Sequence, residues 1–216
     1  MTPEKSSKRE GGALSWLAIY REPVVLRMFF LGFSSGLPLL LVLGTLSFWM
    51  REVGVDLKSI GFMSWVGLCW GMKWLWSPLV DKLRIPLLSS RLGQRRAWLL
   101  TAQIGLIVSL ALMAFADPAK SLTLTAALAL TTAFFGATQD IALDAFRIES
   151  GSEEKQAAFA ATYQTGYRLA MIWAGAGALA IAAFFETQFG TAVGWRSAYL
   201  VMSASMLVGV VTVLLS

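Results

Sequence analysis

The sequence predicts an all-α membrane protein with six transmembrane helices, and two observations carry this prediction. Hydrophobic residues occupy 56% of the 216 positions and charged residues 14%, against about 25% charged residues in soluble domains. Apolar runs of about 20 residues, the length that crosses the hydrocarbon core of a bilayer, recur along the chain. Short polar connections separate these runs, which favours an up-and-down bundle.

The expected elements begin with a tail and continue through six apolar runs. Residues 1–23 are expected to form a basic cytoplasmic tail and an interfacial segment that contains Trp16. Residues 24–216 are expected to form one bundle, with helices at about 24–50, 59–79, 97–116, 122–146, 157–185 and 196–216. The first run exceeds a signal-peptide core and lacks a convincing cleavage site, so we expect a retained helix.

Glycine, alanine and proline predict local features of two helices. Pro38 predicts a kink in the first helix, because proline removes a backbone donor. Gly32, Gly36 and Gly44 in this helix, and the alanine-glycine run 174–178 in the fifth, are small residues. Small residues let transmembrane helices approach closely, so we expect these positions to lie at helix–helix contacts.

Lysine and arginine are unevenly divided between the two sides of the expected membrane. Twelve lie with the N-terminal tail and the connections at 80–96 and 147–156, and four lie on the opposite side. This excess predicts a cytoplasmic N-terminus, and an even number of helices returns the C-terminus to the same side. The last apolar run reaches Ser216 with no polar residue after it, so we expect one half of a larger transporter.

Several functional classes are disfavoured by composition. The chain has no histidine and a single cysteine, Cys69, so we expect no internal disulfide, no metal site and no cofactor. The net charge of +5 comes from loop residues, which indicates topology and not a nucleic-acid partner. No nucleotide-binding glycine loop and no nucleophile–base pair can be proposed, so we expect a non-enzyme driven by an ion or substrate gradient.

The most informative polar residues lie at the end of the fourth helix. Asp140, Asp144 and Arg147 fall within about 60° of one helical face, given about 100° per residue. A charge at mid-bilayer costs about 2.5–3.5 kcal/mol, so these groups should face protein, water or substrate. Asp140 and Asp144 are therefore candidates for proton coupling. The alternative is a static ion pair of Asp140 with Arg147 or Arg168.

Further polar and aromatic residues inside the spans are candidates for substrate binding. An arginine can hold a carboxylate through two bonds, an amide can bind a sugar, and an indole can stack on one. Packing, snorkelling of the lysine and an interfacial aromatic belt are the structural alternatives. The candidates are Gln139, Arg168, Lys73, Tyr163, Gln164, Tyr167, Trp70 and Trp74.

Several strings together resemble the AmpG-type muropeptide permeases of the major facilitator superfamily. They are GFSSGLPLLL at 32–41, IG at 60–61, KWLWSPLVD at 73–81, GQRRAW at 93–98, ATQDIALDAFR at 137–147 and GWRSAY at 194–199. The resemblance runs from about Leu26 to the end of the chain and covers only the N-terminal half of such a twelve-helix transporter.

The resemblance implies a bacterial inner-membrane importer. Its cargo would be N-acetylglucosaminyl-anhydro-N-acetylmuramic acid and its peptides, recycled from the cell wall, with protons as the coupling ion. The same import feeds β-lactamase induction in some bacteria. The lipid bilayer and a C-terminal half or second copy would be the other partners.

The resemblance also implies a cytoplasmic gate. Asp81 with Arg95 or Arg96 is similar to the superfamily's loop motif, with Ser77 at the usual glycine and about nine extra residues between the acidic and basic parts. Asp144 and Arg147, near the membrane edge, would join this charge network, which is the alternative to a proton-coupling role for Asp144. Two alternatives remain open: another major-facilitator transporter, for acetyl-coenzyme A or a drug-like solute, and a non-transporting half-permease fragment.

Overall fold

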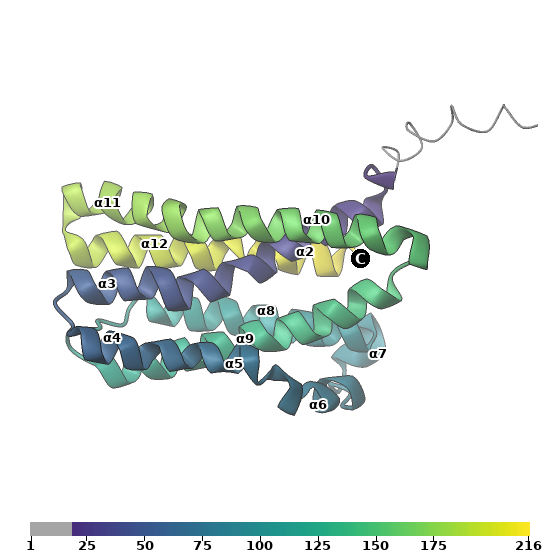
Figure 1. The fold of residues 1–216 in the computed structure, drawn as a ribbon, viewed down its shortest axis with the longest axis horizontal. Coiled ribbons are helices and arrows are strands. Elements are labelled where there is room, and N and C mark those ends of the chain that lie inside the picture. The colour runs from purple at the N-terminus through teal and green to yellow at the C-terminus, as the bar shows by residue number, and fades with distance from the viewer. Residues whose placement is uncertain (1–18) are drawn as a thin grey trace, which may run out of the picture.

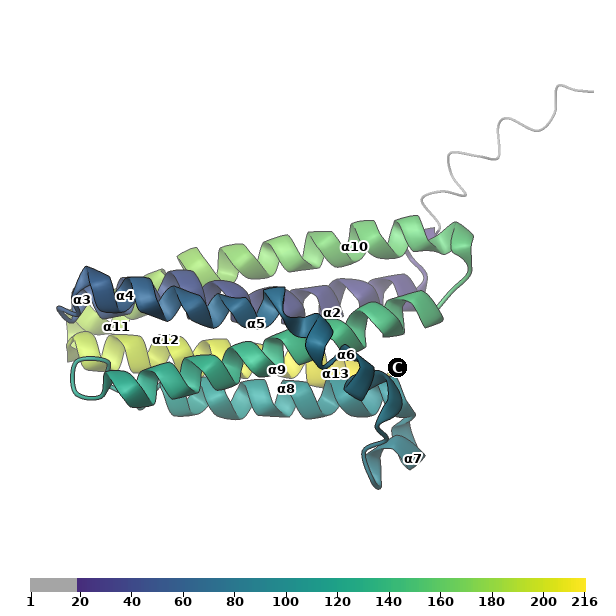
Figure 2. The same cartoon turned by 60° about the horizontal axis from the view of Figure 1, so that its bottom comes forward.

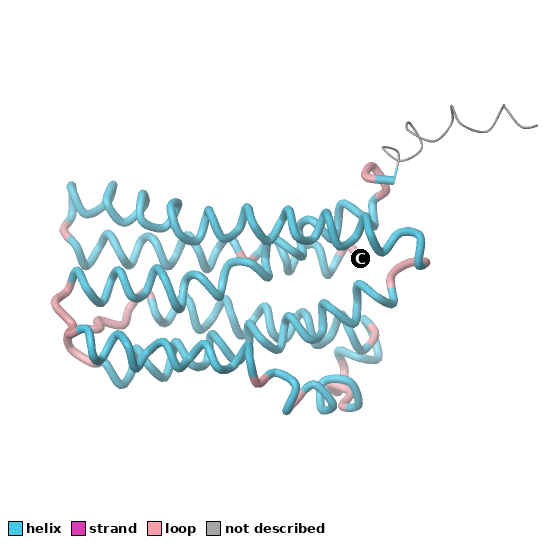
Figure 3. Tube along the Cα trace, viewed as in Figure 1, coloured by secondary structure: helices cyan, strands magenta, loops and turns pink. Residues whose placement is uncertain are grey.

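The computed structural model describes residues 19–216, which form an all-helical bundle without a strand (Figure 3). The predicted fold class is therefore confirmed for this part of the chain. The expected tail and its Trp16 lie almost wholly outside the described residues. Figure 1 shows the long helices running side by side along one axis.

Within residues 19–216, five helical stretches are long and apolar enough to cross a membrane. Pro23–Glu52 contains α2 (Pro23–Leu40) and α3 (Leu46–Glu52), and Glu153–Phe189 contains α10 (Glu153–Ile172) and α11 (Ala178–Phe189). The other three stretches are α8 (Gln94–Met113), α9 (Leu122–Glu149), and α12 (Thr191–Ser205) with α13 (Leu207–Leu214).

The second expected helix is interrupted and is not among these five stretches. It consists of α4 (Leu57–Met63), α5 (Leu68–Gly71) and α6 (Ser77–Lys82), with 3₁₀ turns at Ser64–Gly67 and Lys73–Leu75. Three glycines lower its helical propensity, and Pro78 disfavours α geometry at the residue before it. Figure 1 shows α4 and α5 running along α9 as part of the bundle, and Figure 2 shows α7 (Leu88–Leu92) extending from one end.

Local residues explain where the helices begin and turn. Pro23 occupies the first turn of α2, where its missing N–H has no helical partner to lose. The Asp56 carboxylate caps α4 by accepting the Ser59 N–H at 2.9 Å. Gly190 joins α11 to α12 with a φ of 88°, a backbone conformation that glycine adopts without steric cost.

Glycines bring α2 and α10 into backbone contact. A Cβ added to Gly32 would lie 2.2 Å from the Tyr163 carbonyl oxygen, and one on Gly166 would lie 2.1 Å from the Phe29 carbonyl oxygen. A side chain at either position would therefore push the helices apart. This contact brings Tyr163 of α10 toward the polar residues of α2.

Two π-helical turns face each other in the middle of the bundle. One, Leu41–Thr45, follows Pro38 and separates α2 from α3; the other, Trp173–Gly177, separates α10 from α11. The Thr45 hydroxyl donates to the Ala174 carbonyl at 2.7 Å, and the Tyr199 hydroxyl donates to the Leu41 carbonyl at 3.0 Å. Side chains thus satisfy carbonyls in both irregular turns.

The principal apolar core lies toward the end opposite α7. Trp49 stacks on Trp195 with ring centroids 5.7 Å apart, and both are buried. The Trp195 indole N–H donates to Glu52 at 2.6 Å. This packing joins α3 to α12, and the C-terminal part of α9 lies toward the other end of the bundle (Figure 1).

Candidate functional site

Polar side chains of α9 meet polar side chains from three other elements, and we call this group the carboxylate cluster. Its members come from α2, the 3₁₀ turn before α6, α9 and α10. They are Ser35, Lys73, Asp140, Asp144, Arg147 and Tyr163.

The inner carboxylate of this cluster, Asp140, is bonded to one of two neighbouring hydroxyl groups. The Ser35 hydroxyl donates to Asp140 Oδ1, and the same hydroxyl lies 3.3 Å from the Tyr163 hydroxyl. Within residues 19–216, Asp140 forms no ion pair. Hydroxyls can donate to an ionised carboxylate or accept from a protonated one, so the site can accommodate either form.

Two cations hold the outer carboxylate. Lys73 Nζ lies 3.4 Å from Asp144 Oδ2, and Arg147 Nη2 lies 3.8 Å from Asp144 Oδ1. The Arg147 guanidinium also stands over the Tyr163 ring, 5.6 Å from its centroid. The side chains of Lys73 and Asp144 are 35% and 47% exposed, so this pair is reachable from outside the bundle. A ligand carboxylate could compete with Asp144 for these cations.

Gln139 is not a member of the carboxylate cluster but belongs to a separate buried group with Ser34 and Gln103. It is fully buried, and its Nε2 lies 3.5 Å from the Ser34 hydroxyl; Gln103 Nε2 approaches the same hydroxyl at 3.5 Å. The side-chain oxygens of both glutamines lack a hydrogen-bond partner among the described residues. A substrate could reach Gln139 only after the helices separate.

The other substrate-binding candidates are scattered around this face. The Tyr167 ring lies near the Tyr163 ring, with centroids 6.0 Å apart and the planes tilted by 42°, whereas Gln164 and Arg168 are exposed on α10. Arg168 forms no ion pair in the described part of the chain, and its Nη1 lies 3.9 Å from the Met171 sulfur. The expected alternative, an ion pair of Arg168 with Asp140, is therefore not present in this conformation.

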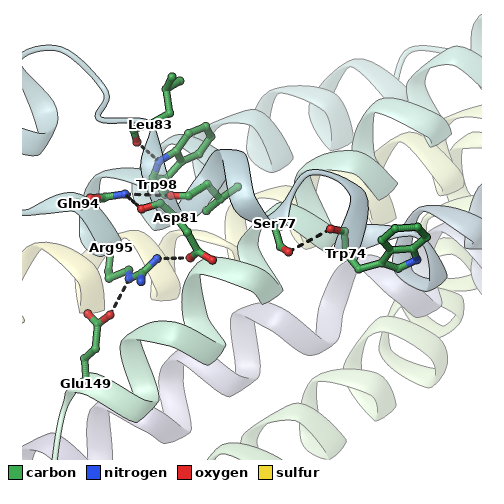
Figure 4. Close-up of polar contacts among 9 residues, drawn as sticks. Trp74, Ser77, Asp81, Leu83, Gln94, Arg95, Trp98 and Glu149 are labelled. Carbon is green, nitrogen blue, oxygen red and sulfur yellow. Dashed lines mark hydrogen bonds and ion pairs between the residues drawn. The ribbon is translucent and has the colours of Figure 1, made fainter.

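The two tryptophans that flank Lys73 in the sequence have different surroundings. Trp70 packs against α9, where a Cβ on Gly136 would lie 2.9 Å from its ring. Trp74 is 66% exposed, and its carbonyl accepts the Ser77 hydroxyl at 3.2 Å (Figure 4). Only Trp74 therefore presents most of its indole surface outside the helix packing.

A second polar group, the end cluster, ties three elements together. Arg95 Nη1 lies 2.6 Å from Asp81 Oδ1, and Arg95 Nε lies 2.9 Å from Glu149 Oε1 (Figure 4). Gln94 Nε2 donates to the Val80 and Asp81 carbonyls, and the Trp98 indole donates to the Leu83 carbonyl. These contacts link the end of α6 and the start of α8 to the end of α9.

The two remaining arginines expected in this charge network form no ion pair with Asp81 or Glu149. Arg96 forms no ion pair within residues 19–216, and Arg147 pairs with Asp144 in the carboxylate cluster. The second carboxylate bonded to Arg95 is Glu149, which sequence reasoning did not include in the charge network. It lies two residues beyond Arg147, and no spacing rule along one helix could have paired it with Arg95.

The family described as acetyl-coenzyme A transporter 1 matches residues 24–182. The chain belongs to this family. The matched range contains every residue of the carboxylate cluster and of the end cluster. Both clusters therefore lie in the part of the chain that matches the family.

Curated relatives of this acetyl-coenzyme A transporter family member agree with the AmpG resemblance. The anhydromuropeptide permease of Escherichia coli K12 is 40% identical over 201 residues, covering 93% of this chain and 39% of that protein. The putative transporter AmpG 4 of Rickettsia felis is 38% identical over 164 residues, covering 76% of this chain and 39% of that protein. The chain thus spans about two fifths of the length of these relatives, which are named as permeases or transporters.

Sequence reasoning missed the residues that partner the carboxylates and amides of this transporter-family chain. Ser34 and Ser35 stand in an apolar helix between Gly32 and Gly36, and Gln103 is a lone amide in the third helix. Polar residues inside apolar spans were a usable signal, because such groups need partners within the protein. The sequence did not show which helix would supply each partner.

Proposed function

We propose that this chain is the N-terminal half of an inner-membrane permease that imports anhydro-muropeptides. The observation that carries the proposal is the 40% identity to a protein named anhydromuropeptide permease over 93% of this chain. Grouping of basic residues near the start of α2 and the loop before α8 supports a cytoplasmic N-terminus. A C-terminal half or a second copy would complete the transport path.

Proton symport is the coupling mechanism that we assign to the carboxylate cluster. Asp140 is the proposed proton carrier, because it accepts the Ser35 hydroxyl and forms no ion pair within residues 19–216. Asp144 is the proposed exchange partner: a carboxylate of the cargo would displace it from Lys73 and Arg147. Cargo binding would thereby free an anionic side chain one helical turn from the proton carrier.

The end cluster is proposed to act as the cytoplasmic gate. Arg95 is bonded at once to Asp81 and Glu149, so opening this end requires at least one of these ion pairs to break. Exposed ion pairs are each worth about 0–1 kcal/mol, which suits contacts that must form and break in every transport cycle.

An acetyl-coenzyme A-like cargo is the second candidate, because the matching family carries that description. Such a cargo brings several phosphate charges. The cations of the carboxylate cluster, Lys73 and Arg147, already share one carboxylate, and Arg168 is the further exposed cation on α10. This small number of cations favours a muropeptide with few carboxylates.

The test is uptake of labelled anhydro-muropeptide into cells that lack their own permease. This chain would be expressed alone and joined to a candidate C-terminal half, with labelled acetyl-coenzyme A as the competing cargo in membrane vesicles. Muropeptide uptake by the joined protein supports the proposal. Uptake of acetyl-coenzyme A alone would replace it with the second candidate, and uptake of neither, with insertion verified, would favour a non-transporting fragment.

A separate substitution tests whether Asp140 couples transport to protons. Asp140→Asn is expected to abolish accumulation against a gradient while membrane insertion stays intact. Asp117→Asn, in the exposed loop between α8 and α9, makes the same chemical change away from the cluster and is expected to keep wild-type uptake. Wild-type accumulation by Asp140→Asn would exclude Asp140 as the proton carrier.

A further inference from the structure

A groove on the described surface lies between the start of α2 and α13, and none of its lining residues belongs to either polar cluster. Its volume is about 710 Å³. Apolar side chains make up most of its lining, and they are exposed: Leu26, Phe30, Leu207, Val208, Val211 and Leu215. In a chain that spans a membrane, a groove of this composition faces hydrocarbon or another apolar surface.

Arginines mark one end of this groove. Arg21 and Arg27 line it together with Pro23, near the start of α2. Figure 2 shows that the C-terminus, which follows α13, lies at this end of the bundle. Neither arginine forms an ion pair within residues 19–216, whereas neighbouring Glu22 is paired with Lys155 at 2.7 Å. Arg27 also lines a smaller adjoining pocket of about 260 Å³ with Arg96. The groove thus has one cationic end and an apolar length.

The length of the groove fits one leaflet of a bilayer. Its lining along α13 and the residue that follows runs from Leu207 to Leu215, which is about 12 Å at 1.5 Å per residue. Half of the hydrocarbon core is about 15 Å thick. A molecule with its charge at the arginines could therefore lay an acyl chain along α13 to nearly the middle of the membrane.

We propose that this groove binds an anionic phospholipid, with the phosphate at Arg21 and Arg27 and an acyl chain between α2 and α13. Charge complementarity selects the headgroup, because guanidinium groups bind phosphate oxygens through paired hydrogen bonds. The apolar lining selects a lipid over a free phosphate. The site is independent of the transported cargo, and it would stabilise the contact between the first and last helices of this chain.

The test is native mass spectrometry of the purified full-length protein that contains this chain. Phosphatidylglycerol and phosphatidylcholine with identical acyl chains are the two probes. We expect tight retention of phosphatidylglycerol only. The double variant Arg21→Gln/Arg27→Gln should weaken its binding by about fivefold for each arginine removed. Arg51→Gln/Lys58→Gln removes the same charge at the opposite end and should leave binding unchanged.

A second variant separates loss of the site from loss of the fold. Val211→Trp fills the middle of the groove and leaves both arginines in place, so it should displace the lipid without a change of charge. Equal retention of both lipids by the wild-type protein would overturn the proposal. Full retention of phosphatidylglycerol by both Arg21→Gln/Arg27→Gln and Val211→Trp would also overturn it. The same holds if the wild-type protein binds no lipid because a part of the protein beyond Ser216 covers the groove.

Discussion

Gly32→Ala tests the backbone contact between α2 and α10 that positions the carboxylate cluster. The new Cβ would lie 2.2 Å from the Tyr163 carbonyl oxygen, whereas ordinary contact begins at 3.4 Å. The neighbour is backbone and cannot rotate away, so the helices must separate by about 1 Å at this crossing. Overpacking of this kind costs about 1–3 kcal/mol, which would lower the melting temperature of a 216-residue chain by about 2–12 °C and that of a longer protein by less.

The separation should also impair transport. Ser35 and Tyr163 lie on the two helices that move apart, and their hydroxyls are 3.3 Å apart in the intact bundle. Muropeptide uptake should therefore fall with melting temperature. Thermal unfolding of the purified full-length protein, followed by tryptophan fluorescence, gives the first value, and uptake into permease-deficient cells gives the second.

Gly61→Ala is the matched control, because a Cβ at that helical position meets nothing within 4 Å. Alanine is the better helix former by about 0.5–1 kcal/mol, so this variant should melt at or slightly above the wild-type temperature. If Gly32→Ala and Gly61→Ala melt within about 1 °C of each other, the helices are not in backbone contact and the reasoning fails.

Three further predictions concern single hydrogen-bonded groups. Arg95→Gln removes the bonds to Asp81 and Glu149 and should raise hydrogen–deuterium exchange in residues 77–96, with little change in melting temperature. Thr45→Val leaves the Ala174 carbonyl without its hydroxyl donor and should destabilise the protein by about 0.6 kcal/mol, at most about 1.7. Asp56→Ala removes the cap of α4. The Ser59 hydrogen bonds lower the pKa of the Asp56 carboxyl below its ordinary 3.8, so the stability lost in Asp56→Ala should be full at neutral pH and vanish as the pH falls through the folded-state pKa.

Each of these variants has a control. Arg96→Gln makes the same change beside Arg95 and should leave exchange unaltered; equal exchange in the two variants would contradict the role of Arg95. Thr131→Val removes a hydroxyl that bonds only within its own helix, and a loss as large as that of Thr45→Val would count against the contact between the two π turns. Asp56→Asn keeps a capping oxygen that does not titrate, so an unchanged pH profile would show that Asp56 ionisation is irrelevant.

Sequence reasoning reached the features that depend on one helix at a time. Apolar length predicted an all-helical membrane fold, and the described residues contain five spanning stretches and one interrupted helix. The spacing of Asp144 and Arg147 placed them within reach of each other, and they lie 3.8 Å apart. Periodicity suffices here, because the α-helix fixes the angle and rise between residues of the same element.

Contacts between helices were decided by the tertiary structure alone. Ser35 and not Arg168 bonds Asp140, Lys73 pairs with Asp144, and Gln139 turns away into a buried group. These partners depend on how each helix is rotated and how closely its backbone approaches the next one. The glycines of α2 and α10 set that approach, and their effect appears only when the helices are packed together.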